Sequence, residues 1–275
     1  MKLLIVALLL IGFLGVRYYL VSSYRVSTLS MEDALHKGDH ILVNKWKKQP
    51  ERKDVVLFSA SLYEDNKQVR SLLLSRCLGM PGDTIQINEN GYFINGKPYP
   101  FSPRTLSVYY MKNHIAQEIF DILKRLNIPL RSLKNNEENT SSFGLTSSEE
   151  SMVREKLPNG AVHLLTKQPT GKYSLIIPQK NRHYRLDEKN IMAYRDAILS
   201  EAGDRAVFRD GKLYLDGKEA TFFFFTKDYY WLLSDNTEEA IDSRYLGIIP
   251  SENILGTAWF CWMSQTKEQI FRWVE

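Results

Sequence analysis

Residues 3–16, near the start of the chain, form a continuous run of apolar residues and glycine. As a helix it would be about 21 Å long at about 1.5 Å per residue, whereas a bilayer core is about 30 Å thick. Extension past Arg17, whose charge can reach the membrane surface, and through Tyr18 and Tyr19 closes most of that difference. The pattern predicts a retained transmembrane anchor over residues 1–22, and a cleavable signal peptide is the alternative.

Beyond the anchor, the chain breaks into short apolar runs of the length and composition typical of β-strands. Residues that favour turns, mainly Gly, Pro, Asn and Asp, separate these runs. Strands are predicted at 41–45, 54–58, 71–79 and 83–87.

Two further segments, 82–97 and 203–218, share one pattern of strand, glycine turn, strand and Asn-Gly or Asp-Gly turn. Alternating apolar residues such as Tyr92 and Ile94 are typical of half-buried hairpins. Two copies are too few for a solenoid, so we expect two hairpins of a single sheet system.

The middle of the chain has a different pattern. Residues 112–126 carry isoleucine and leucine at helical spacing, and 187–200 open with acidic residues as a second short helix would. The polar stretch 134–151 is predicted to be a mobile loop. We therefore expect a mixed α/β insertion over 101–202, inside a β core made of 23–100 and 203–275.

Composition narrows the function classes. The 275 residues are 44% hydrophobic and 25% charged, which suits a globular protein with a sizeable core, and the net charge of +4 gives no argument for nucleic acid. Cys77 and Cys261 lie among apolar residues and are interpreted as buried, with a disulfide as the alternative in an exported domain. The five histidines are scattered, so we predict no metal, and the sequence indicates no cofactor.

The segment STLSMEDALHKGDHILVNK, residues 27–45, introduces a family resemblance. It resembles the nucleophile segment of type I signal peptidases, serine peptidases of family S26, in which Ser-Met-x-Pro-Thr-Leu precedes a Gly-Asp turn and an apolar strand. Ser30 matches the nucleophile, and Thr28 matches a hydroxyl of the oxyanion hole. The sequence departs from the family at Asp33, where proline is usual, and at Ala34, where threonine is usual.

Four later segments match the family in the same order: KDVVLF, SRCLGMPGDTI, SDNTEEAIDSRYLGIIP and ILGTAWFCW, at 53–58, 75–85, 234–250 and 254–262. The resemblance covers about two thirds of the chain. It implies an antiparallel β core behind one transmembrane helix, with the site on the exported side of the cytoplasmic membrane. It also implies that an exported preprotein binds as an extended strand with small residues at positions −1 and −3. The substrate contacts that it implies are Met31, Val55 and Leu57.

The chemistry requires a base that removes the proton of the serine hydroxyl as it attacks a carbonyl. The family uses a lysine whose charge burial suppresses. Alignment on Arg76 and the Met-Pro-Gly-Asp turn leaves Ser75 at the lysine position, and no lysine occurs from Gln68 to Tyr92. Arg76 cannot replace it, because a guanidinium stays protonated.

The closing segment carries a second loss. The family has a serine that orients the lysine amine, and Ala240 stands at that position. The remaining motif residues are interpreted as a structural hydrogen-bond and ion-pair network near the site: Arg76, Asp235, Asn236, Asp242, Ser243 and Arg244.

Loss of one member of a nucleophile–base pair costs on the order of 10⁴–10⁶ in rate. His36, His40 and Lys37 are candidate replacement bases, although solvated turn residues are the simpler interpretation. Two hypotheses follow. One is a signal peptidase I-like enzyme with weak or unconventional activity. The other is a pseudo-peptidase that binds signal peptides, or an active peptidase paralogue, without cutting. Either would contact membrane lipid and exported preproteins, and neither would bind nucleic acid.

Overall fold

The computed structural model describes most of the chain, namely residues 15, 20–32, 34–64, 67–88, 91–99, 106–136, 139–158, 165–167, 173–187, 190–236, 240–265 and 270–274. The predicted anchor over residues 1–22 lies almost wholly outside this set. Among the described residues, no helix is both long and apolar enough to cross a membrane.

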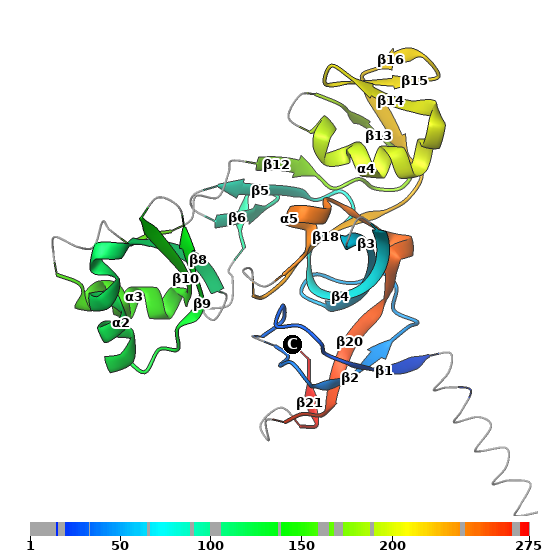
Figure 1. Ribbon diagram of the computed structural model, residues 1–275. Coiled ribbons are helices and arrows are strands. Elements are labelled where there is room, and N and C mark those ends of the chain that lie inside the picture. Colours follow the sequence, from blue (N-terminus) through cyan, green and yellow to red (C-terminus); the bar gives the residue numbers. More distant parts are fainter. Residues whose placement is uncertain are drawn as a thin grey trace, which may run out of the picture.

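The body of the protein is an antiparallel sheet, the main sheet, which joins both ends of the chain (Figure 1). Its strands in spatial order are β1 (Val21–Arg25), β2 (His40–Asn44), β20 (Ile254–Met263), β3 (Val55–Glu64), β4 (Lys67–Gly79), β18 (Tyr229–Leu233) and β19 (Ile249–Pro250), and β21 (Arg272–Trp273) pairs with β20. The strands predicted at 41–45, 54–58 and 71–79 are confirmed as β2, β3 and β4. The mostly β, antiparallel character predicted from the sequence is confirmed.

The centre of the main sheet is buried on both faces. On β3, Val55 and Leu57 pack into one cluster with β2 and β20, whereas Val56 and Phe58 pack into a second cluster with β18 and β19. This explains why β3 is a continuous apolar run rather than an alternating one. Cys77 and Cys261 are free thiols, one in each cluster, as buried small residues would be.

The segment 82–97 forms a hairpin in a second sheet. That sheet has the spatial order β12 (Tyr173–Ile176), β5 (Thr84–Asn88), β6 (Gly91–Ile94) and β7 (Lys97–Pro98). Asn95 and Gly96 both have positive φ, 52° and 76°, which is the turn geometry that an Asn-Gly pair favours.

The second hairpin, 203–218, also forms, but the prediction of one sheet system was wrong. Its strands β14 (Ala206–Arg209), β15 (Lys212–Leu215) and β16 (Lys218–Ala220) make a separate sheet. Near it lie α4 (Ile191–Ala202) and the ribbon of β13 (Arg182–Arg185) and β17 (Phe222–Phe225). The similar sequences of the two segments determine that each forms a hairpin. Which strands lie beside each hairpin depends on long-range pairing, which the local sequence does not specify.

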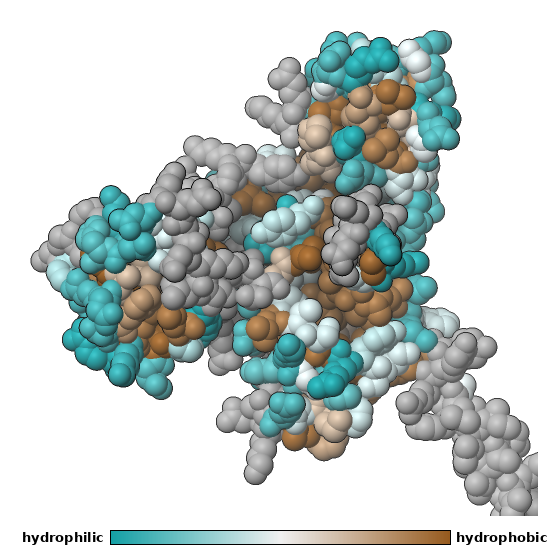
Figure 2. All heavy atoms as spheres, in the orientation of Figure 1, coloured by the Kyte–Doolittle hydropathy of each residue, from teal (hydrophilic) through white to brown (hydrophobic). Residues whose placement is uncertain are grey.

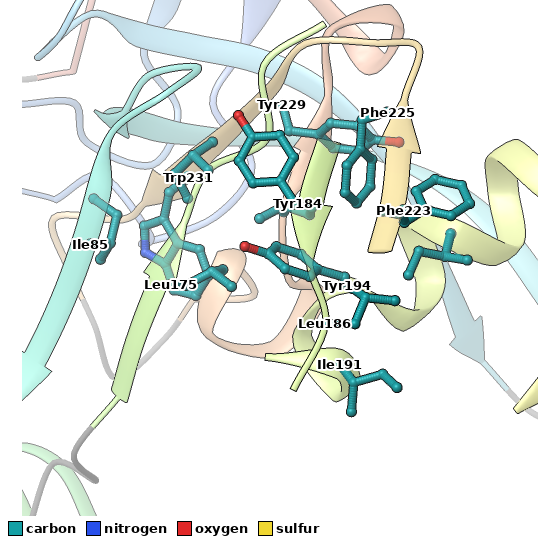
Figure 3. Packing of buried hydrophobic residues seen from close by; sticks show 14 of the residues in the cluster. Ile85, Leu175, Tyr184, Leu186, Ile191, Tyr194, Phe223, Phe225, Tyr229 and Trp231 are labelled. Atoms are coloured by element: carbon teal, nitrogen blue, oxygen red, sulfur yellow. The ribbon is translucent and has the colours of Figure 1, made fainter. Parts of the chain in front are cut away.

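One large aromatic core joins these peripheral elements to the main sheet (Figure 3). Tyr194 of α4 and Phe225 of β17 pack edge to face at 5.5 Å between ring centroids, and Phe225 meets Tyr229 of β18 at 5.3 Å. Leu175 of β12 and Trp231 of β18 belong to the same cluster. The segment 173–202 therefore packs with the hairpins and the main sheet.

Residues 106–167, the inserted unit, have a core of their own (green in Figure 1). The chain order is β8 (Leu106–Lys112), η1 (Asn113–Ile115), α2 (Ala116–Arg125), β9 (Arg131–Asn136), β10 (Thr140–Thr146), α3 (Ser147–Lys156) and β11 (Leu165–Lys167). Its sheet order is β11-β8-β10-β9, a split β-α-β arrangement. The self-contained part of the insertion is thus shorter than the expected 101–202.

The expected mobile loop at 134–151 was wrong. This stretch contains all of β10, whose Phe143 and Leu145 are fully buried, and the first turn of α3. A capping box starts α3, because Thr146 accepts the Glu149 backbone N–H and the Glu149 side chain accepts that of Thr146. Serines within β10 and in the first turn of α3 made the sequence resemble a loop.

The remaining short elements are α5 (Ser243–Leu246), η3 (Gly203–Arg205) and η4 (Ser251–Asn253). The two predicted helices, 112–126 and 187–200, are confirmed as α2 and α4, each beginning a few residues later than expected.

Candidate active site

The predicted nucleophile, Ser30, lies in the loop between β1 and β2. The next residue, Met31, is fully buried with Leu35, and a turn joins them because the Leu35 backbone N–H donates to the Met31 carbonyl at 2.6 Å. Two apolar side chains thus fix the loop onto the sheet. The local sequence holds Ser30 in place even with Ala34 at the position of the family threonine.

The Ser30 hydroxyl has two hydrogen-bond partners among the described residues. Its Oγ lies 2.9 Å from the Thr28 Oγ1 and donates to the Leu74 carbonyl of β4 at 3.4 Å. On the backbone, the Asn236 N–H donates to the Ser30 carbonyl at 2.9 Å. The structure therefore brings the segment 27–45 and the closing segment 234–250 together with β4 around Ser30.

Ser75, which the sequence comparison predicted to stand at the position of the family lysine, is completely buried on β4. Its Oγ lies 2.9 Å from the Oγ of Ser234, which is also buried. Sequence reasoning missed Ser234, which directly precedes Asp235 and so stands where the family's closing segment has glycine. The signal was present in the sequence, but its meaning depends on a contact across 159 positions.

Arg76, the next residue on β4, forms a two-pronged ion pair. Its Nε donates to the Asp235 Oδ1 at 2.8 Å and its Nη2 to the Oδ2 at 2.7 Å, while its Nη1 donates to the Lys53 carbonyl. This pairing joins β4 to the closing segment directly beside the two serines.

Asp242 forms a second polar centre and is fully buried. It accepts the Ser234 backbone N–H at 3.0 Å and the Arg244 Nε at 2.9 Å, and it caps the N-terminus of α5. Ser243 accepts the Leu232 backbone N–H through its hydroxyl. These groups fix the backbone on which Ser234 stands.

Ala240 is buried too, and its methyl group offers neither a donor nor an acceptor. At the two positions that the family resemblance assigns to the base and its orienting serine, the structure has the Ser75 hydroxyl, which contacts Ser234, and the Ala240 methyl group.

The candidate replacement bases do not hydrogen-bond to Ser30 within the described part of the chain. The His36 ring nitrogen Nδ1 is buried without a hydrogen-bond partner in that part, the His40 ring packs edge-on against Trp262 at 5.5 Å, and Lys37 is exposed to solvent. In the same part of the chain, the hydroxyl that meets Ser30 is that of Thr28, which is no base at neutral pH.

The Cys77 thiol and the Tyr92 hydroxyl both remain protonated at neutral pH. Burial, with the charge of Asp54 adding to it, raises the pKa of the Cys77 thiol to about 12. Burial likewise raises the pKa of the Tyr92 hydroxyl to about 12, although the charge of Arg244 opposes it. Neither a thiolate nor a phenolate is therefore available as a base from these two residues.

The residues predicted to contact substrate are inside the protein. Met31, Val55 and Leu57 belong to the buried cluster on one face of the main sheet, and β3 is paired on both sides from Val55 to Phe58. Contact between these three side chains and a substrate stays a prediction.

The accessible surface beside Ser30 belongs to β4. In β4, β18 pairs only with the stretch from Arg76 to Gly79, so between Lys67 and Ser75 no described strand takes the second edge. Val69 and Leu72 on this stretch are exposed, and Figure 2 shows hydrophobic residues gathered over β3 and β4 on the viewed face. An unpaired edge with apolar neighbours is the surface that an extended peptide can join as an extra strand.

The fold and site define a β-rich scaffold of the serine-peptidase kind, with a positioned serine, a neighbouring hydroxyl and a stretch of β4 that has no second partner strand among the described residues. The family model described as "Signal peptidase, peptidase S26" matches residues 1–170 and 221–263. The chain belongs to this family.

Curated relatives match either most of the chain or a shorter part of it. "Signal peptidase I" of Buchnera aphidicola subsp. Baizongia pistaciae is 23% identical over 275 residues, covering 92% of this chain and 73% of the relative. "Signal peptidase I" of Aquifex aeolicus is 24% identical over 267 residues, covering 94% and 81%. "Signal peptidase I V" of Bacillus subtilis is 35% identical over 77 residues, covering 27% and 42%.

Proposed function

We propose that this protein takes part in signal-peptide processing as a membrane-anchored pseudo-peptidase. It binds the signal peptides of exported preproteins along the open edge of β4 and does not cut them at the rate of a Ser/Lys enzyme. The single observation that carries this proposal is the Ser75–Ser234 hydroxyl pair, which lies where the family resemblance would have the base, while the Ser30 hydroxyl bonds to Thr28 and Leu74.

Binding has independent support in the retained scaffold. The Asn236 N–H holds the Ser30 carbonyl, and Arg76 holds Asp235. These contacts keep the nucleophile loop against β4, beside the exposed Leu72. A peptide added to this edge would gain main-chain hydrogen bonds and burial of apolar side chains, neither of which requires a base.

The anchor and location belong to the same proposal. The apolar segment 3–16 would hold the chain in the cytoplasmic membrane by a single helix, with the described domain on the exported side. Only a short stretch separates this segment from β1, so Ser30 would lie near the lipid surface. An active signal peptidase paralogue is the proposed protein partner.

A second candidate is residual peptidase activity. The 2.9 Å contact between Thr28 and Ser30 favours it, because a hydroxyl beside the nucleophile can stabilise an oxyanion. Oxyanion stabilisation alone leaves about 10³–10⁴-fold catalysis over water, far short of a complete site.

The test uses the full chain in detergent, a preprotein with small residues at −1 and −3, and its fluorescent signal peptide. We expect binding of equal affinity by wild type and Ser30→Ala, and no cleavage by either. Leu72→Asp should weaken binding at least tenfold, whereas Ile176→Asp, at a similarly exposed position on β12, should not. Robust cleavage that disappears in Ser30→Ala would overturn the proposal.

A further inference from the structure

The second hydroxyl of the buried pair is unexplained by loss of the base alone. Loss of catalysis requires only Ser75, yet Ser234 brings its side chain to 2.9 Å from Ser75 at a position where the family resemblance has glycine. Ser75 and Ser234 both differ from the family motif, and their side chains are in contact although they are 159 positions apart in the sequence. We therefore look for one physical reason that explains both differences.

We propose that Ser234 fills the space beside Ser75 and serves as its hydrogen-bond partner. Its hydroxymethyl group occupies the space beside position 75 that a lysine chain requires, and it supplies the hydrogen bond that a buried serine needs. This inference rests on the proposed function, and it adds that the site has been repacked around the missing base, so that lysine alone does not restore it.

The two serine side chains are enclosed by other atoms. Ser75 has no exposed surface and Ser234 is 2% exposed. Protein interiors are packed at crystal-like density and contain few voids larger than a water molecule. A chain four carbons long at position 75 therefore needs room that a neighbour must give up, and Ser234 is the neighbour whose side chain bonds to Ser75.

The Ser75 hydroxyl requires a hydrogen-bond partner in its buried position. A buried hydroxyl without a partner is costly, and nearly all such groups in native proteins are paired. The Ser30 hydroxyl bonds to Thr28 and Leu74, so Ser75 is served by Ser234 instead. With glycine at position 234, Ser75 would lose this partner, which explains why the two serines occur together.

The backbone at position 234 does not require glycine. Glycine there would therefore differ from serine mainly by leaving more space beside position 75. Ser234 is absent from the residues with positive φ. Its N–H donates to the buried Asp242 carboxylate, and this bond is kept by any residue other than proline. Ser234→Gly is therefore expected to keep the local fold and to remove two heavy atoms next to position 75.

The first test measures packing without any catalysis. Ser75→Met places an unbranched chain of nearly lysine length, without charge, at the position. It should lower Tm by about 3–8 °C when position 234 is serine, and by less than half as much when the reference and the variant both carry Ser234→Gly. The matched control is Ser59→Gly, an equally buried serine on β3 that bonds to Arg70, and it should give no relief. Equal losses with and without Ser234→Gly would overturn the inference.

The second test rebuilds the dyad in the full chain in detergent, with the same preprotein. Ser75→Lys with Ala240→Ser should stay at background, and addition of Ser234→Gly should raise cleavage at least 100-fold, in a manner abolished by Ser30→Ala. Equal cleavage rates of the double and the triple variant would overturn the inference while the proposed function stands. Ser30-dependent cleavage by wild type overturns the proposed function, and the methionine series then decides the packing claim separately.

Discussion

Two neighbouring positions on β4 meet the closing segment in opposite ways. Arg76 binds Asp235 through two short hydrogen bonds between charged groups, and both residues match the family motif. Ser75 binds Ser234 through one hydroxyl contact, and both residues depart from the motif. The ion pair that holds the strand to the segment therefore matches the family motif, whereas the adjacent hydroxyl pair does not match it.

The difference teaches that architecture and catalysis are separable at a spacing of one residue. Successive side chains of a strand point to opposite faces. Position 76 therefore serves the ion pair on one face of the strand, whereas position 75 faces the other side, where it lies completely enclosed. Selection on binding alone would keep the first pair and release the second.

The ion pair should show the largest effect. Asp235→Ala leaves the Arg76 guanidinium, only 16% exposed, without its carboxylate, and loss of one partner of such a pair costs about 3–5 kcal/mol. Denaturant unfolding should detect this loss. The control is Glu219→Ala in the exposed pair with Lys212, where the cost should stay below about 1 kcal/mol. Similar losses in the two variants would show that Asp235 does not fix the strand.

An ion pair of the same two-pronged form lies away from the site in the inserted unit. Arg131 donates to both oxygens of Glu149 at 2.8 and 3.0 Å, and Glu149→Gln should cost about 1–3 kcal/mol of stability at pH 7. Signal-peptide binding at 25 °C should not change, because the pair lies in the inserted unit, which has a core of its own. Thermal unfolding and the binding assay check the two expectations, and weaker binding would contradict the separation of the two regions.

The same pair predicts a pH dependence. Burial alone would raise the pKa of the Glu149 carboxyl, but hydrogen bonds from Arg131 and the Thr146 backbone outweigh it, so the pKa is lowered. A lowered folded-state pKa gives stability that is present above the ordinary carboxyl value and is lost as the pH falls through the folded value. The Tm difference between wild type and Glu149→Gln should be constant from pH 7 to 5 and shrink below about pH 4. A difference that grows in acid would contradict this assignment.

In the hydroxyl pair, the double change should show the smallest effect, and the two single changes should show the clearest coupling. Ser234→Ala leaves the buried Ser75 hydroxyl unpaired, which costs about 1–3 kcal/mol, whereas the double change to alanine should be close to neutral. A double-mutant cycle of denaturant unfolding measures the difference. Additive losses would mean that the two hydroxyls are not each other's partners.

The sequence predicted those parts of the fold that local patterns determine. Apolar runs located β2, β3, β4 and β5, and the Asn95-Gly96 turn located the hairpin around it. The helix α2 followed from isoleucine and leucine at helical spacing. Each of these signals acts over a few residues, so the printed sequence contains it in full.

The errors came from long-range pairing and from polar residues inside regular structure. Nothing local states that the hairpins at 82–97 and 203–218 belong to different sheets. The strand β10 contains Ser141 and Ser142, both buried, and its polar composition suggested a loop. The Thr146-x-x-Glu149 capping signature was present and would have located α3.

The sequence predicted individual residues of the candidate site but not the contacts between them. Ser30, Thr28 and Ser75 were located from the motifs, yet Ser234 gained meaning only through its 2.9 Å contact with Ser75. Burial of Met31 and Val55 could not be read from the motif, because the same apolar residue can face a substrate or a core.

The most direct test of the missing base is the pH dependence of preprotein cleavage from pH 6 to 10, measured with wild type and Ser30→Ala under the same conditions. We expect two superimposable background rates at every pH, because no group with a neutral proton-accepting form lies at the Ser30 hydroxyl among the described residues. A wild-type rate that rises with pH along a titration curve and vanishes in Ser30→Ala would contradict the pseudo-peptidase proposal.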